Sequence, residues 1–193
     1  MSNSPIGSLS FAQFLHFGAV IGVFVCLKLW ASGATHAEVG FLTHPVSSFI
    51  GLITGSPGEL LPNGAYDHAR LGIVIEKSCS GSNFWLLCFG LLNLALFRFV
   101  SGISQSMGIL ALTLSSAYII TPLVNTSRII SYLFVQERIP DLPGMASGKL
   151  HLAMGAFIYL GALVTVYALT VYLTSKITHS YAQPPESQMD ISG

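Results

Sequence analysis

Four long apolar runs restrict what this chain can fold into. Each is roughly twenty residues long and almost free of charge, which matches an α-helix that crosses the hydrocarbon of a bilayer. Lipid offers the backbone no hydrogen-bond partners, so spans of this kind form helices. The runs are residues 11–31, 82–100, 107–124 and 150–173. The sequence therefore predicts an all-α fold, a polytopic integral membrane helical bundle of about four to six membrane helices or re-entrant segments.

The composition supports a membrane protein and gives no sign of nucleic-acid binding. Charged residues make up 8% of the chain, whereas a water-soluble domain carries about a quarter. The formal net charge is zero, so there is no excess of basic residues for nucleic acid. The lipid bilayer is the partner that this composition implies. We expect one integral membrane domain over residues 1–179 and a polar, disordered tail over residues 180–193.

The segments between the long runs predict only short or irregular structure. Residues 39–53 are apolar but interrupted by His44-Pro45, which favours an interfacial or partly re-entrant helix. Residues 55–72 are rich in Gly and Pro and indicate loop and turns. Pro122 is expected to kink or break its helix, because proline lacks the backbone N–H. Such a break leaves residues 129–135 too short to cross the membrane alone.

Isolated polar residues inside the apolar runs are expected to have structural roles. Asn93 predicts a hydrogen bond between helices, and Arg98 can reach the membrane interface. Three cysteines without a CxxC pair suggest neither a disulfide framework nor a zinc site, and Cys26 and Cys88 are interpreted as packing residues. No metal and no cofactor are expected. Four histidines without metal-ligand spacing are interpreted as packed, interfacial or surface residues: His16, His36, His44 and His68.

Cys79 differs from the other cysteines because it lies among polar residues at the edge of a span, in the stretch EKSCSGSNFW (residues 76–85). The second run leaves this membrane face, and the third run returns to it. Arg128 follows the third run closely, and His151 opens the last run. Since the segment between them is not expected to cross, Cys79, Arg128 and His151 are predicted to lie at one membrane surface.

These residue types suit acyl transfer. A thiolate attacks a carbonyl far better than a thiol does, and a nearby cation such as Lys77 could stabilise it. An imidazole can take and return the proton, and an arginine can stabilise the thiolate or the oxyanion of a tetrahedral intermediate. Gly81 would permit a close approach of substrate or a tight entry into the helix. The constellation therefore predicts a cysteine enzyme.

Three other interpretations stay open from the residues alone. Arg128 and His151 could be interfacial anchors, which helix ends often carry. Ser80 or Ser82 could serve an intramembrane serine hydrolase, although the first glycine of a GxSxG pattern is missing. A small non-enzymatic membrane protein, either a transporter or an assembly scaffold, would not need Cys79 at all.

The strings EKSCSGSNF (residues 76–84) and NTSR (residues 125–128), with a histidine that opens a later helix, resemble the exosortase/archaeosortase family. The first string is most similar to the branch called exosortase K, and the similarity covers about residues 70–170. The resemblance implies a membrane-embedded cysteine protease or transpeptidase without a cofactor. Its implied substrates are exported proteins that end in a short motif, a transmembrane helix and a basic tail, and it would cleave this C-terminal sorting signal.

The resemblance also assigns roles to single residues. The family's nucleophile falls on Cys79, its arginine on Arg128 and its histidine on His151, while Asn125 would orient the arginine. The implied location is the bacterial cytoplasmic (inner) membrane, as a multi-pass protein with its active site on the periplasmic or extracytoplasmic side. This orientation places several basic residues outside, against the positive-inside tendency: Arg70, Lys77, Arg128, Arg138 and Lys149.

Overall fold

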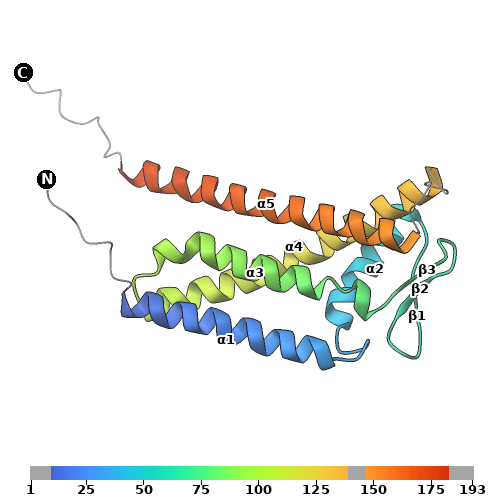
Figure 1. The fold of residues 1–193 in the computed structure, drawn as a ribbon, viewed down its shortest axis with the longest axis horizontal. Helices are drawn as coiled ribbons and strands as arrows, with labels where there is room; N and C mark the ends of the chain where they lie inside the picture. The colour runs from blue at the N-terminus through green and yellow to red at the C-terminus, as the bar shows by residue number, and fades with distance from the viewer. Residues whose placement is uncertain (1–9, 139–146, 183–193) are drawn as a thin grey trace, which may run out of the picture.

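Over the part of the chain that the structure describes, four long helices form the membrane-spanning bundle (Figure 1). The computed structural model describes residues 10–138 and 147–182, with side chains over 10–138 and 152–178. Each of the four is long and apolar enough to cross a bilayer, α3 together with the short 3-10 helices η1 and η2 at its two ends. The chain is therefore an all-α polytopic membrane bundle, which confirms the predicted fold class. The elements are α1 (Phe11–Gly33), η1 (Lys77–Cys79), α3 (Ser82–Leu96), η2 (Phe97–Phe99), α4 (Ile103–Arg138) and α5 (Ser147–Ala182).

Successive long helices run in opposite directions, so the bundle has two distinct ends (Figure 1). Residues 77–81, the C-terminal part of α4 and the start of α5 lie at one end, which we call the cysteine end. The start of α1 and the last turns of α5 lie at the opposite end. The backbones of Cys79, Arg128 and His151 therefore all lie at the cysteine end.

Helix α3 is the centre of the bundle. It packs on α1, α4 and α5, and more than half of its span is buried, whereas α1 and α5 are mostly exposed. Phe84 and Phe89 of α3 form the core with Ala117 of α4. Cys88 is fully buried there, in agreement with its expected packing role, whereas Cys26 is exposed on α1. Because α3 is central, residues at its N-terminus can reach every other long helix.

Helix α4 is continuous, which corrects the predicted break at Pro122. Pro122 is buried, and the packing of α4 against α2 and α3 holds the helix together across the missing N–H. The helix has 36 residues, so it is about 54 Å long at about 1.5 Å per residue. Since the hydrocarbon layer is only about 30 Å thick, part of α4 must lie outside it. Residues 129–135 therefore extend the spanning helix instead of forming a separate piece.

The short helix α2 (Gly40–Thr54) lies at the cysteine end and packs against α4. Its 15 residues are too few to span a bilayer, in agreement with the interfacial or re-entrant helix that the sequence predicts. The predicted interruption at Pro45 is wrong, because the helix continues through it. Pro45 lacks the N–H that would bond to the Phe41 carbonyl. The Tyr118 hydroxyl of α4 donates to that carbonyl instead, at 3.1 Å.

The segment after α2 folds into a small antiparallel sheet, which corrects the predicted loop. Asn63-Gly64, a pair typical of tight hairpins, lies between its first two strands and is the sequence signal for this fold. Ile75 in the last strand is buried, and the chain passes from it directly into η1. The sheet therefore positions the start of the cysteine turn. Its strands are β1 (Glu59–Leu60), β2 (Tyr66–His68) and β3 (Ile73–Ile75), in the order β1-β2-β3, with Leu60 opposite Tyr66 and His68 opposite Ile73.

His68 holds the sheet on α2. Its ring is fully buried, with Nε2 at 2.9 Å from Ser47 Oγ and Nδ1 at 2.7 Å from the Ser56 carbonyl oxygen. A carbonyl can only accept, so Nδ1 donates to Ser56 and the Ser47 hydroxyl donates to Nε2. The expectation of a surface or interface residue is therefore wrong for His68, whereas His16 is packed as expected.

The far end of the bundle agrees with the expected role of Arg98. Its side chain is exposed there, and Nη2 donates to Thr174 Oγ1 at 3.0 Å. Helix α5 continues to Ala182, so it includes residues 180–182 of the segment expected to be a disordered tail. The rest of that segment, residues 183–193, lies outside the described residues.

Replacing Tyr118 with Phe should lower the thermal stability of the protein in detergent, because it leaves the Phe41 carbonyl without a donor. A hydrogen bond of this kind contributes about 0.5–1.5 kcal/mol. The loss should shrink in a Pro45→Ala background, since the alanine N–H can bond to the same carbonyl. Tyr172→Phe, on the exposed face of α5, is the control. Equal losses in both backgrounds would mean that Tyr118 acts by packing alone.

Candidate functional site

The turn that carries Cys79 is shaped by its own backbone. In η1 the Cys79 N–H donates to the Glu76 carbonyl at 2.8 Å. Gly81 then adopts a φ of +72°, and its carbonyl accepts the Trp85 N–H in the first turn of α3. Other residues rarely adopt this φ, so glycine lets the chain turn sharply from η1 into α3. This geometry agrees with the tight helix entry predicted for Gly81.

Asn125 binds the cysteine turn from the side of α4. Its amide nitrogen donates to the Cys79 carbonyl, and its amide oxygen accepts a hydrogen bond from the Tyr159 hydroxyl at 2.7 Å. The side chain is fully buried, and Gly81 packs so closely that a Cβ there would lie 3.3 Å from Asn125 Cγ. One side chain thus joins α4, the start of α3 and α5. These bonds differ from the expected role of Asn125, which was to orient Arg128.

The end of α1 holds the same turn from another side. The Lys77 ammonium donates to the Ser32 and Ala34 carbonyls at 2.8 and 2.7 Å. A cation at this place also interacts favourably with the C-terminal end of the helix dipole. The Lys77 backbone N–H donates to His36 Nδ1 at 3.2 Å. Lys77 therefore anchors the turn on α1, a role that its sequence context did not predict.

Acidic side chains flank this anchor. Glu76 accepts a hydrogen bond from the Ser78 hydroxyl at 2.9 Å. Hydrogen bonds from the backbone N–H and hydroxyl of Thr35, together with the Lys77 charge, hold the pKa of Glu38 below its ordinary value. Glu38 is therefore ionised at neutral pH, and its bonds to Thr35 close the loop between α1 and α2.

Arg128 presents an unpaired edge of its guanidinium. Among the described residues, nothing bonds to its buried Nε and Nη2 atoms. The guanidinium lies over the Tyr159 ring, 5.3 Å from its centroid, and Cδ packs on Gly155, where a Cβ would approach to 3.2 Å. Nε and Nη2 form one side of a planar fork, which matches the oxygens of an anion. Buried donors of this kind are costly unless a ligand or water meets them, so this edge indicates a binding site.

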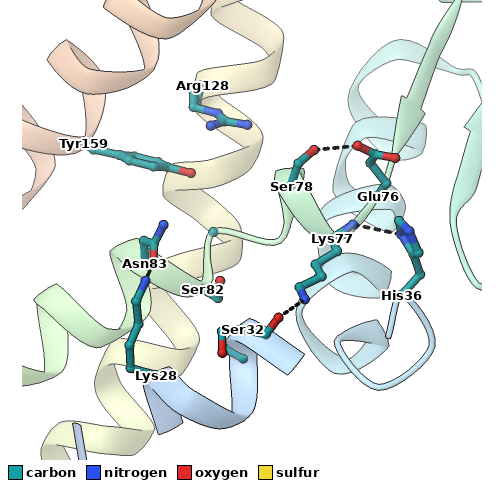
Figure 2. A pocket seen from close by; sticks show the side chains of 12 residues that line it. Lys28, Ser32, His36, Glu76, Lys77, Ser78, Ser82, Asn83, Arg128 and Tyr159 are labelled. Atoms are coloured by element: carbon teal, nitrogen blue, oxygen red, sulfur yellow. Dashed lines mark hydrogen bonds between the residues drawn. The ribbon is translucent and has the colours of Figure 1, made fainter. Parts of the chain in front are cut away.

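A cavity of about 530 Å³ lies beside this edge at the cysteine end (Figure 2). Figure 2 shows Arg128 and Tyr159 on one side of it and Lys77 with Ser78 on the other. Three basic residues and one carboxylate line it, so it favours an anionic or strongly polar ligand. The lining residues are Lys28, Ala31, Ser32, His36, Glu76, Lys77, Ser78, Gly81, Ser82, Asn83, Arg128 and Tyr159.

Cys79 lies next to this cavity and not in its lining. Its neighbours Ser78 and Gly81 line the cavity, while its own side chain is partly buried against an apolar cluster. The thiol lies 3.7 Å from Ser78 Oγ. Cys79 and Arg128 both act electrostatically on the Tyr159 hydroxyl, so the two groups share one neighbour. The apolar cluster consists of Val46, Ile50, Ile75 and Ile129.

Position 151 lies on the same stripe of α5 as two residues of the site. It precedes Gly155 by four residues and Tyr159 by eight, so the three positions follow one face of the helix. The backbone thus carries position 151 one turn past the contact between Gly155 and Arg128. The side chain of His151 lies outside the described part of the structure.

Two residues of this site were not predicted from the sequence. Tyr159 bonds to Asn125 and lies against Arg128, and its helical spacing from His151 is a signal that could have found it. His36 was interpreted as a surface or interface residue, but it is partly buried and lines the cavity. No local pattern marks His36, because only the loop between α1 and α2 brings it to the site.

Comparisons of the chain with protein-family models, with curated proteins and with solved structures find no match in any of the three. The argument for function therefore depends on the geometry of the cysteine end and on the short strings around Cys79 and Arg128.

Gly81→Ala should destabilise the protein more than Gly55→Ala. The two glycines have similar positive φ values, +72° and +66°, a conformation that costs other residues about 1–2 kcal/mol. Only at Gly81 would the new Cβ also meet Thr121 and Asn125, at 3.1 and 3.3 Å. We expect a lower unfolding temperature and, because the turn loosens, faster reaction of Cys79 with a thiol reagent. Equal effects of both substitutions would show that contact with α4 does not hold the turn.

Proposed function

We propose that this chain is a membrane-embedded cysteine protease or transpeptidase, which cleaves C-terminal sorting signals of exported proteins through a thioester on Cys79. One observation carries the proposal: Asn125 joins the Cys79 backbone to Tyr159, over which the unpaired guanidinium of Arg128 lies. The resemblance of the strings around Cys79 and Arg128 to the exosortase/archaeosortase family supplies the reaction and the substrate class.

The proposed reaction begins at the sulfur of Cys79. For attack, the side chain turns about its Cα–Cβ bond, away from the apolar cluster and toward the cavity that Ser78 and Gly81 line. His151 accepts the thiol proton, and the thiolate adds to the scissile carbonyl carbon. The tetrahedral intermediate then breaks the C–N bond, leaves a thioester, and releases the amine with the proton from His151. Water or an acceptor amine attacks the thioester, and its proton returns to the sulfur.

Arg128 stabilises the negative charge that develops on the carbonyl oxygen. Its two unpaired N–H groups are available for that oxygen, and packing on Tyr159 and Gly155 holds the guanidinium in place beforehand. A donor that is already oriented needs no reorganisation during the reaction. Removal of one such donor typically lowers the rate by about 10²–10³-fold.

The proposed orientation places the cysteine end on the periplasmic or extracytoplasmic side of a bacterial cytoplasmic (inner) membrane. Basic residues oppose that orientation mainly where they are free to interact with lipid and the insertion machinery. Several at this end are instead bound within the fold, which reduces the conflict. Lys28 donates to Asn83 Oδ1, Arg70 to the Gly55 carbonyl, and Lys77 to the end of α1.

A non-enzymatic role, as a transporter or an assembly scaffold, is the second candidate. The observation that favours it is the position of the Cys79 side chain against the apolar cluster, where a cysteine packs like a small hydrophobe. In that role the thiol is dispensable, whereas the Asn125 bonds still hold the helices together.

Cys79→Ala and Cys79→Ser should abolish C-terminal processing of membrane-anchored exported proteins in the native host, because the nucleophile is lost. The measurement is accumulation of uncleaved precursors on immunoblots, with membrane insertion of each variant checked in parallel. Cys26→Ala is the matched control, since Cys26 is exposed on α1 and far from the site. Normal processing by well-inserted Cys79→Ala protein would exclude the cysteine mechanism and favour the non-enzymatic role.

Arg128→Lys should reduce the processing rate by about 10²-fold or more, because a lysine ammonium cannot supply the paired N–H groups of the guanidinium fork. Arg98→Lys keeps charge and size at the opposite end of the bundle and should leave the rate unchanged. Pulse-chase labelling of a precursor protein measures both variants. A processing rate of Arg128→Lys equal to that of wild type would reduce Arg128 to a structural anchor.

A further inference from the structure

A second, much smaller cavity lies at the end of the bundle opposite Cys79. Its volume is about 50 Å³, and it lies between α1 and α3. Most of its wall is apolar, with Phe17 and Val20 on one helix and Leu94 on the other. The polar side chains in this wall are His16 and Asn93.

Both polar residues direct a buried atom that has no partner. His16 is 1% exposed and Asn93 is 2% exposed. Among the described side chains, His16 Nε2 and Asn93 Oδ1 are both without a hydrogen-bond partner. Because the two residues come from different helices and line the same cavity, one small occupant can meet both atoms.

The other hydrogen bonds of Asn93 determine which of its atoms is unpaired. Nδ2 donates to the Phe89 carbonyl and to Thr113 Oγ1, both at 2.8 Å, the second of which is the interhelical bond predicted from the sequence. A flipped amide would direct its oxygen at the Phe89 carbonyl, which has no proton to donate. The Thr113 hydroxyl already donates to the Ile109 carbonyl at 2.8 Å. Asn93 Oδ1 is therefore an acceptor that needs a donor from the cavity.

The hydrogen bond of His16 restricts the occupant further. Nδ1 lies 2.9 Å from Ser106 Oγ, a contact that either tautomer of the ring can make. With a proton on Nδ1, Nε2 needs a donor; without one, Nε2 carries the proton and needs an acceptor. The occupant must donate to Asn93 in both cases. Only a group that both donates and accepts satisfies every combination.

We propose that this cavity holds a water molecule that bridges His16 Nε2 and Asn93 Oδ1. A buried water needs about 10–15 Å³ and two or more polar partners, and the cavity provides both. An apolar occupant such as an acyl chain would leave both atoms unpaired, and a cation would leave a protonated Nε2 opposed. Through Ser106 and Thr113 the water joins α1 and α3 to α4, so it fastens the far end of the bundle independently of the chemistry at Cys79.

A structure of the full chain in a lipid nanodisc, at a resolution that shows ordered water, tests this directly. We expect a density peak within hydrogen-bonding distance of both His16 Nε2 and Asn93 Oδ1. An empty cavity, a lipid chain in it, or a direct bond between the two side chains would each overturn the proposal.

A double-mutant cycle on the unfolding temperature gives a second test. His16→Phe and Asn93→Leu should each lower the unfolding temperature, and the double variant should lose less than the sum, because either substitution alone removes the bridge. The matched control pairs His16→Phe with Thr165→Val, a distant exposed site on α5, where the losses should add. Additive losses for His16 and Asn93 would contradict a shared water.

Discussion

The hydrogen bonds of Asn125 are the interaction on which the cysteine end depends. They tie the carbonyl of Cys79 and the hydroxyl of Tyr159 to one amide on α4, and so connect three helices at a single buried point. The Tyr159 ring in turn supports Arg128, and Gly81 is small enough to let α3 approach α4 at this height. If this amide were lost, the cysteine turn and the arginine would no longer share a fixed frame.

A membrane bundle must satisfy its polar backbone groups internally, and this requirement explains several features at once. Pro45 would leave a carbonyl unpaired in α2, and Tyr118 of α4 supplies the missing donor. The free carbonyls at the end of α1 are met by the Lys77 ammonium. In each case a side chain from a later segment completes an earlier helix. These completions draw α2, the sheet and the cysteine turn against α4, beyond the part of that helix that the hydrocarbon can cover.

The spans of this chain follow from hydrophobic length alone, and the shared end of Cys79 and Arg128 follows from counting them. Local rules were less reliable where burial overrides them: Pro122 does not break α4, because packing on both sides holds that turn. The sheet was missed although Asn63-Gly64 marks its first hairpin, since glycine and proline were read only as loop formers. The bonds from Asn125 to Cys79 and Tyr159 could not be predicted, because they join positions 46 and 34 residues apart.

The two ends of the bundle treat their unpaired polar atoms differently, and the difference separates structure from proposed chemistry. At the far end, His16 and Asn93 direct their free atoms into a cavity with room for little more than water. At the cysteine end, Arg128 directs two N–H groups beside a cavity about ten times larger, lined by three basic residues. Both sides of the cysteine turn are held through its backbone and Lys77, while the thiol itself stays free to rotate. A fixed backbone with a mobile nucleophile beside an oriented cation is an arrangement that covalent catalysis can use.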